Sequence, residues 1–285
     1  MYPREFDYVV PASLDEALDA LASNPGAKVL AGGMSLLPLM KMRLFSPEMV
    51  VDIGRIPGLG DISDNGDHLA IGALVRHKQT ASSDLVAAHA AALAEAASYT
   101  GDPQVRARGT TCGALAHADI AADQPAAALA LGSTMVAASK AGRREIAAAD
   151  FFVDTLTSAL NPDEILVEVR VPKAGGGSVY DKLGRRGGHS DYAVAGAAAW
   201  VKKSNGTVED ARVALTGVGL KPTLAAGSME AIIGSDGGAD AVASAAERAT
   251  EGVTVLEDLY GSEAYKAHLA KVYVGRALEQ AIARA

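Results

Sequence analysis

Apolar and polar residues follow two different periods along this chain, one typical of helices and one typical of strands. The clearest helical pattern begins at Ser13-Leu-Asp-Glu16, a capping-box sequence, and continues with Ala17, Leu18 and Leu21 on one face. We therefore predict a helix over 14–23. Similar patterns predict helices over 84–98, 124–131, 223–233, 238–249 and 262–284.

Short apolar or alternating runs, bounded by turn-forming residues, predict the strands. These runs cover 28–30, 49–53, 68–73, 134–139, 164–171, 178–184, 192–202 and 207–217. Ser204-Asn-Gly206 predicts a tight turn between the last two. We expect a loop over 54–66 and a long irregular stretch over 101–122, both rich in glycine and polar residues.

A change of composition divides the chain in two. Val171-Pro-Lys-Ala-Gly-Gly-Gly-Ser178 contains one proline and three glycines, which end regular structure and allow a new unit to start. At 285 residues the chain is also long for one compact core. We therefore expect two or three structural units, and we find no internal repeat.

Composition and charge exclude several classes of protein. Hydrophobic residues make up 49% of the chain, which is enough for a buried core and argues against disorder. No apolar run is long enough to span a membrane, and the N-terminus lacks the apolar core of a secretory signal, so we expect a cytoplasmic protein without a transmembrane segment. With 26 basic and 34 acidic residues, and no basic patch, nucleic-acid binding is not expected.

Cys112 is the only cysteine. One cysteine cannot form an internal disulfide, and it cannot by itself hold an iron–sulfur cluster or a structural zinc ion. Any metal-based redox chemistry linked to this chain must therefore lie on another polypeptide.

The first glycine-containing loop is the run from Lys28 to Ser35, which is a strand followed by a tight turn. Gly32 and Gly33 lack Cβ atoms, so backbone N–H groups could approach a pyrophosphate closely, and Ser35 adds a hydroxyl. A Gly-Gly pair after a strand is more often only a turn, and the spacing does not match the Gly-x-Gly-x-x-Gly dinucleotide fingerprint.

The second loop runs from Gly109 to Asp119 and leads to Asp123-Gln-Pro125. Asp123 has two interpretations that residue type alone leaves open. It could cap the N-terminus of the next helix, or its carboxylate could bind ribose hydroxyls, as acidic residues do in other dinucleotide sites. His117 and Asp119 lack a third ligand, so we predict no metal site there.

Several ordered motifs resemble one family over essentially the whole chain. Leu30-Ala-Gly-Gly-Met-Ser-Leu-Leu-Pro-Leu-Met-Lys-Met-Arg-Leu44 is similar to the first FAD-binding segment of the medium subunits of carbon monoxide dehydrogenase and related xanthine oxidase-type molybdenum hydroxylases. Asp102-Pro-Gln-Val-Arg106, with Gly109-Thr110 onward, resembles the second segment. Glu164-Ile-Leu166, Tyr180-Asp-Lys-Leu183, Asp191-Tyr-Ala193 and the helix from Ala264 to Ala285 match further landmarks.

The resemblance implies an α+β fold. A PCMH-type FAD-binding domain would span 1–173, with lobes of about 1–55 and 56–173. A smaller domain at 178–285 would contain a three-stranded antiparallel sheet and a helical bundle.

The resemblance also implies the cofactor-binding residues. Those of the two loops are Lys28, Val29, Leu30, Ala31, Gly32, Gly33, Met34, Ser35, Thr110, Thr111, Cys112, Gly113 and Ala114, and Gly101 precedes the second loop. Asp123 would hold a polar group of FAD, and Leu166 would contact the flavin region through its backbone. Lys182 would lie near the ring or its linker, and Tyr192 would cover one flavin face as a gate.

Four features depart from the family pattern. Met34 stands where relatives usually have a polar residue, and Ala114 replaces a common asparagine or serine. Cys112 replaces the first glycine of a Gly-Gly pair, so this position has ordinary dihedral angles or the loop is rearranged. Arg185-Arg-Gly-Gly-His-Ser190 is slightly longer than in relatives, which affects the placement of Tyr192.

The resemblance implies an oxidoreductase subunit that binds FAD and has no catalytic acid, base or metal ligand of its own. The partners would be a large molybdenum cofactor-binding subunit and a small subunit with 2Fe-2S clusters, assembled as a dimer of heterotrimers. Electrons would pass from the clusters through FAD to an external acceptor. The substrate stays open between carbon monoxide, an N-heterocycle and an aldehyde. Two alternatives are a self-sufficient flavoprotein oxidoreductase and a flavin-free assembly subunit.

Overall fold

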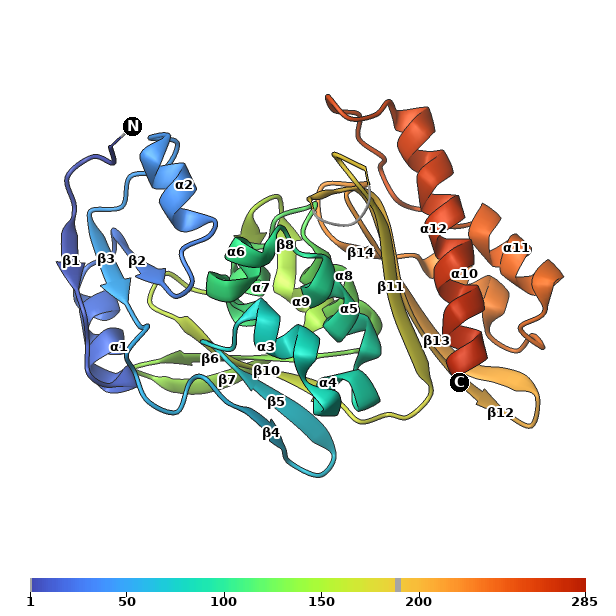
Figure 1. Cartoon of the computed structure of the whole chain (residues 1–285), viewed down its shortest axis with the longest axis horizontal. Coiled ribbons are helices and arrows are strands. Elements are labelled where there is room, and N and C mark those ends of the chain that lie inside the picture. Colours follow the sequence, from blue (N-terminus) through green and yellow to red (C-terminus); the bar gives the residue numbers. More distant parts are fainter. Residues whose placement is uncertain (1, 188–190) are drawn as a thin grey trace.

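A computed structural model describes residues 2–187 and 191–285 (Figure 1). Sheets of three, five and four strands lie side by side along the long axis of the molecule, and helices pack between and around them. Residues 188–190 of the Arg185–Ser190 segment lie outside the described residues. Helices and strands are mixed throughout, which confirms the α+β fold class.

The first sheet is entirely parallel and has the order β1-β3-β2. Its elements are β1 (Asp7–Val9), α1 (Leu14–Ser23), β2 (Ala27–Leu30), α2 (Leu36–Lys41) and β3 (Met49–Asp52). The Ser13 Oγ accepts a hydrogen bond from the Glu16 N–H, so the capping interaction starts α1 where the sequence predicts it. Ala17, Leu18 and Leu21 are buried in the core of this lobe.

The second sheet is antiparallel and has the order β4-β5-β10-β6-β7. Its strands are β4 (Ile62–Asp64), β5 (His68–Gly72), β6 (Thr134–Ser139), β7 (Gly142–Ala147) and β10 (Ile165–Pro172). The helices of this region are α3 (His77–Ser82), α4 (Asp84–His89), α5 (Ala91–Tyr99), α6 (Pro103–Arg108), α7 (Thr111–His117), α8 (Asp123–Ala130) and α9 (Ala148–Phe151). β8 (Phe152–Asp154) and β9 (Thr157–Ser158) form a separate short ribbon.

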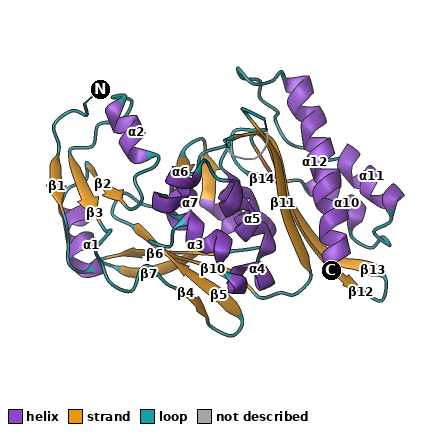
Figure 2. Ribbon diagram, in the orientation of Figure 1, coloured by secondary structure: helices purple, strands orange, loops and turns teal. Residues whose placement is uncertain are grey.

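The third sheet is also antiparallel and has the order β11-β12-β13-β14. Its elements are β11 (Gly177–Gly184), β12 (Ala193–Ser204), β13 (Thr207–Thr216), β14 (Thr223–Leu224), α10 (Ala226–Ile232), α11 (Ala239–Glu247) and α12 (Glu263–Arg284). α12 packs on β11 and β12, while α5 and α8 of the preceding region also pack on this sheet (Figure 2). The sheet is therefore buried between two groups of helices.

Several sequence-based predictions of local structure were wrong. The single helix over 84–98 is divided at Ala90, whose φ of −146° and ψ of 49° interrupt the helix. The region 101–122 is not irregular, because Asp102 caps α6 and Thr110 caps α7. Elements outside the predicted set include β1, α2, α3, β4 and β7.

The third sheet also differs from the expected three strands. Thr223 and Leu224 pair with β13 as a fourth strand, so the helix predicted over 223–233 begins only at Ala226. The turn at Ser204–Gly206 is confirmed, because Asn205 and Gly206 have φ values of 51° and 82°.

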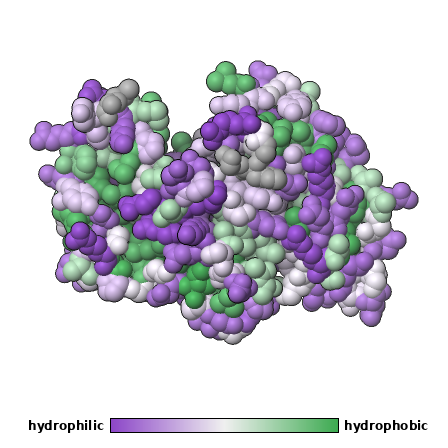
Figure 3. All heavy atoms as spheres, viewed as in Figure 1, coloured by the Kyte–Doolittle hydropathy of each residue, from purple (hydrophilic) through white to green (hydrophobic). Residues whose placement is uncertain are grey.

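Hydrophilic side chains cover much of the surface, and the space-filling outline is hollowed between the lobe of the first sheet and the C-terminal strands and helices (Figure 3). In the part of the chain that the structure describes, no helix combines the length and the apolar character needed to cross a bilayer.

Candidate functional site

The two glycine-containing loops of the sequence lie against each other. The first connects β2 to α2, and the second leads from α6 into α7. A Cβ atom added to Gly32 would stand 2.3 Å from the Arg108 carbonyl oxygen and 2.7 Å from the Gly109 Cα. Only glycine permits this approach of two backbones. The sequence predicted both loops but not their contact.

The first loop has a row of free hydrogen-bond donors. Within residues 2–187 and 191–285, the backbone N–H groups of Gly32, Gly33, Met34 and Ser35 donate to no protein acceptor. Gly33 has a φ of 76°, a region that favours glycine. Successive N–H groups in such a turn form a concavity that binds anions. Lys28, Val29 and Leu30 lie in β2, which leads into this turn.

The second loop is ordered by the start of α7. The Thr110 Oγ1 accepts a hydrogen bond of 3.0 Å from the Gly113 N–H, so Thr110 is the N-cap. Cys112 lies within the helix and its φ is not positive, which explains how cysteine can replace glycine at this position. Its Sγ donates to the Ile71 carbonyl, and burial raises the pKa of the thiol to about 12.

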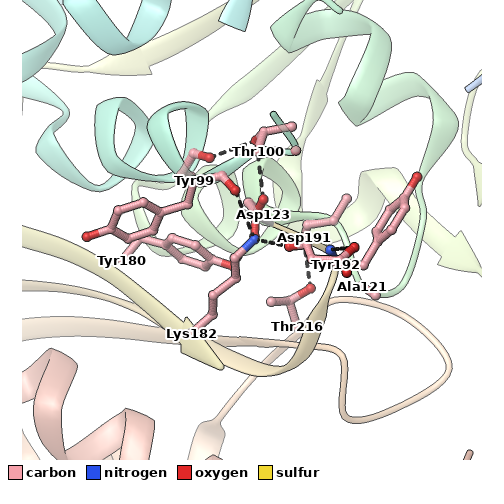
Figure 4. A network of polar contacts seen from close by, with 12 residues as sticks. Tyr99, Thr100, Ala121, Asp123, Tyr180, Lys182, Asp191, Tyr192 and Thr216 are labelled. Atoms are coloured by element: carbon pink, nitrogen blue, oxygen red, sulfur yellow. Dashed lines mark hydrogen bonds and ion pairs between the residues drawn. The ribbon is translucent and has the colours of Figure 1, made fainter. Parts of the chain in front are cut away.

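Asp123 is not a helix N-cap, because Ala122 occupies that position. The Asp123 side chain is buried and accepts hydrogen bonds from three donors (Figure 4). The Tyr180 hydroxyl and the Lys182 Nζ donate to its Oδ1 over 2.5 and 2.7 Å, and the Thr100 Oγ1 donates to its Oδ2 over 3.2 Å. Burial raises the pKa of Asp123, and the neighbouring Lys182 charge opposes this effect.

Lys182 connects the third sheet to the helices of the second. Its ammonium group is fully buried and donates to the Tyr99 carbonyl over 3.2 Å, as well as to the Asp191 carbonyl. These acceptors and Asp123 come from α5, from α8 and from the segment before β12. Lys182 is therefore fixed at the junction between β11 and the preceding helices.

Tyr192 extends from the start of β12 toward the first loop. Burial raises the pKa of its phenol, and the nearby Ser35 side chain opposes this effect. The residue is 40% exposed, and the Arg185 guanidinium carbon lies 5.2 Å from the centre of the Tyr192 ring. Tyr192 thus joins the third sheet to the first glycine-containing loop.

The other predicted residues that lie outside the first loop are on β10, after α5 and on α7. Leu166 is buried in β10, against which α7 packs. Gly101 follows α5 with a φ of 51°, and its carbonyl accepts a hydrogen bond of 2.8 Å from Arg106. Thr111 is buried in α7, and Ala114 is half-buried in the same helix.

Gln124 and His77 form a buried polar pair. The Gln124 Nε2 donates to the Thr100 Oγ1 over 2.6 Å and lies 3.1 Å from the His77 Nδ1. Burial, together with the positive charges of Arg106 and Arg76, lowers the pKa of His77 to about 4. The Gln124 Oε1 is buried and has no protein partner among the described residues.

Sequence reasoning missed Thr100 and Tyr180. Tyr180 and Lys182 are two positions apart on β11, so their side chains share one face of the sheet. This spacing could have indicated that the two side chains bind the same acceptor. Nothing in the local sequence links either of them to Thr100 or to Asp123.

The geometry fits a dinucleotide with a diphosphate. The free N–H groups of Gly32–Ser35 supply donors for phosphate oxygens, and the second loop lies beside them. No group of three or more His, Cys, Asp or Glu side chains in the described residues is arranged to hold a metal ion.

Two family models match the chain. An FAD binding domain in molybdopterin dehydrogenase matches residues 4–174, and a CO dehydrogenase flavoprotein C-terminal domain matches residues 178–281.

Similar proteins are known over the full length. The carbon monoxide dehydrogenase medium chain of Hydrogenophaga pseudoflava is 40% identical, and the match covers 100% of this chain and 99% of the relative. The 6-hydroxypseudooxynicotine dehydrogenase complex subunit alpha of Paenarthrobacter nicotinovorans is 38% identical, with 100% and 97% covered. A solved structure of the Hydrogenophaga pseudoflava carbon monoxide dehydrogenase, in a form lacking the Mo-pyranopterin moiety, matches with a TM-score of 0.95 and 41% identity, covering 100% of this chain and 99% of that one.

Proposed function

The chain belongs to the family of FAD-binding medium subunits of carbon monoxide dehydrogenase and related xanthine oxidase-type molybdenum hydroxylases, and on that premise we propose that it is the flavin subunit of a heteromeric hydroxylase. FAD is the cofactor of this oxidoreductase family. When bound, FAD supplies an electron store that links iron–sulfur clusters on a partner to an external acceptor.

The observation that carries the proposal is the contact between the two glycine-containing loops. Free N–H groups of Gly32–Ser35 would bind the diphosphate, with Lys28, Val29 and Leu30 of β2 and the adjoining Ala31 as support. Thr110–Ala114 and Gly101 would form the facing wall. Because Met34 and Cys112 contribute backbone at these positions, their side chains need not contact the phosphates.

Residues outside the loops would position the rest of the cofactor. The Asp123–Lys182 pair would form a rigid polar wall at the junction of the sheets. Leu166 would contribute its backbone beside α7. Tyr192, which lies near Ser35, would cover one face of the flavin and exclude water from it.

The family implies the partners, because relatives of this chain are named as a medium chain or as a subunit of a complex. A small subunit would carry the 2Fe-2S clusters and a large subunit the molybdenum cofactor, which agrees with the single cysteine of this chain. We expect a dimer of such heterotrimers. The FAD-binding unit would span residues 1–173 and the C-terminal unit residues 178–285, separated by the glycine run before β11.

Purification from the native source tests this proposal. We expect two accompanying chains, one with molybdenum and one with iron–sulfur signals. Separated from them, this chain should oxidise no organic substrate, while its flavin absorbance should bleach with dithionite and return in air. Recovery of a fully active single-chain enzyme would contradict the proposal.

A further inference from the structure

Three residues form a row across the third sheet. Lys182 on β11 is paired with Gly196 on β12, and Gly196 is paired with Thr216 on β13. A Cβ atom on Gly196 would stand 2.8 Å from the Lys182 Cβ and 3.1 Å from the Thr216 Cγ2. Glycine at the centre therefore leaves room for the two outer side chains to extend on the same face of the sheet.

The third sheet uses this face to hold the segment between α7 and α8. The Thr216 Oγ1 donates to the Ile120 carbonyl over 2.9 Å and to the Ala122 carbonyl over 2.7 Å (Figure 4). The Gly217 N–H also donates to Ile120, over 2.7 Å. Thr216 is only 1% exposed, so one buried hydroxyl serves two carbonyl groups.

The same segment receives two further bonds from the sheet. The Ala193 N–H donates to the Ala121 carbonyl over 3.0 Å, and Lys182 forms its ion pair with Asp123. Each of the four consecutive residues 120–123 is thus bound by a donor of the third sheet. Tyr192 directly precedes Ala193, so the arrangement also fixes where the tyrosine leaves β12.

We propose that the Lys182–Gly196–Thr216 row is an interdomain lock, in which Thr216 is a positioning residue for FAD. The inference rests on the proposed function, because it concerns how the FAD site is held together. Thr216 contacts no cofactor in this account. It holds residues 120–123, to which Asp123 belongs and beside which Tyr192 begins, and so fixes both of these side chains relative to the glycine-containing loops.

Because of this lock, the hydrogen bonds of Thr216 should influence how tightly the protein binds FAD. A buried carbonyl that loses its donor is destabilised, so removing the Thr216 hydroxyl would leave the Ala122 carbonyl without a donor and loosen residues 120–123. Coupling between two equilibria is reciprocal, and FAD binding should therefore tighten the same hydrogen bonds. A purely structural hydroxyl elsewhere in the C-terminal region would lack this link.

The test compares three variants of the full-length chain, purified with the subunits that accompany it. Thr216→Val removes the donor at nearly constant volume, and Thr216→Ser restores it. Ser228→Ala is the matched control, because the buried Ser228 hydroxyl donates to the Ala245 carbonyl over 2.7 Å within α10 and α11. FAD is removed, and its dissociation constant is measured by flavin fluorescence together with the circular dichroism of the bound flavin.

We expect Thr216→Val to raise the dissociation constant about tenfold and to change the flavin dichroism, because the buried hydroxyl that holds the Ile120 and Ala122 carbonyls is lost. Thr216→Ser and Ser228→Ala should bind FAD as the parent does. Parent-like affinity in Thr216→Val, or an equal loss in Ser228→Ala, would overturn the lock. If the parent itself bound no FAD, the proposed function would fail, a result that is distinct from these.

Amide hydrogen exchange of the parent supplies a second measurement that needs no variant. FAD should slow exchange at the N–H groups of Gly217 and Ala193, which donate to the Ile120 and Ala121 carbonyls. Amides within α11, away from this junction, should be unaffected. Unchanged exchange at Gly217 and Ala193 on FAD binding would overturn the coupling.

Discussion

The Asp123 carboxylate and the Lys182 ammonium lie 2.7 Å apart, with side-chain exposures of 4% and 0%. They are 59 positions apart in the sequence, one at the start of α8 and one on β11. A buried ion pair of this kind is costly to break, because the remaining charge loses its partner without regaining water. The pair therefore ties the third sheet to the helices that precede it.

Replacing Asp123 by asparagine tests this relationship. Lys182 would keep its hydrogen bonds to the Tyr99 and Asp191 carbonyls but would face a neutral amide in place of the carboxylate. Because its buried charge then lacks a counter-ion, we expect the free energy of unfolding of the FAD-free protein to fall by about 3 kcal/mol. FAD retention should weaken as well. Urea unfolding followed by circular dichroism measures the first effect.

Two controls accompany this measurement. Asp15→Asn removes the exposed ion pair with Lys140 and should hardly change stability. The double variant Asp123→Asn/Lys182→Met should recover part of the loss, because it removes the unpaired charge. Equal effects of Asp123→Asn and Asp15→Asn would show that the buried pair does not stabilise the packing of β11 against α8.

His77 should make the protein sensitive to acid. Burial lowers its pKa from 6.5 to about 4, so below pH 6.5 the unfolded chain takes up a proton that the folded chain does not. Stability is therefore lost as the pH falls from about 6.5 to about 4, by up to about 3 kcal/mol for this group. Chemical unfolding at several pH values gives the slope.

The variant His77→Asn removes the titrating group, so its stability should depend less on pH across this range. His268→Asn, on the exposed side of α12, should keep the slope of the parent. A His77→Asn slope identical to the parent's would assign the acid sensitivity to other groups.

Cys112 should be chemically inert in the folded protein. Its thiol is buried and its pKa is raised to about 12, so almost no thiolate is present near neutral pH. An aromatic disulfide reagent should label the chain only after unfolding. Rapid labelling of the native protein at pH 8 would mean that α7 opens or that Cys112 is exposed.

Gly32 tests the contact between the loops. In Gly32→Ala the added methyl group would clash with the Arg108 carbonyl and the Gly109 Cα, so the loops must separate and FAD retention should fall at least tenfold. Gly60→Ala is the control, because a Cβ atom there meets nothing within 4 Å. Equal FAD content in the two variants, measured by absorbance per chain, would argue against the loop contact as part of the site.

Local signals explain which parts of the fold were predictable. The Ser13 cap and the apolar face of α1 lie within one short stretch, so the helix could be predicted with its observed ends. The helices α6 and α7 are each only one or two turns long and follow glycines, so their caps at Asp102 and Thr110 were missed. β14 has two residues, and only its pairing with β13 identifies it.

The site was predictable in its loops but not in its long-range contacts. Gly32, Gly33 and Thr110 could be selected because glycine and a capping hydroxyl have local meaning. The partners of Asp123 could not, because they depend on how β11 packs against α8. Met34 and Cys112 departed from the family pattern, and for Cys112 the helical position removes the conflict.

The most direct test of the central claim is the flavin content of the purified parent chain. Neither loop contains a residue pattern that we associate with covalent flavin attachment, so FAD should be held by hydrogen bonds and packing alone. Acid precipitation should release about one FAD per chain into a yellow supernatant, identified by mass spectrometry. A preparation without flavin, or flavin that remains with the precipitated protein, would contradict the account.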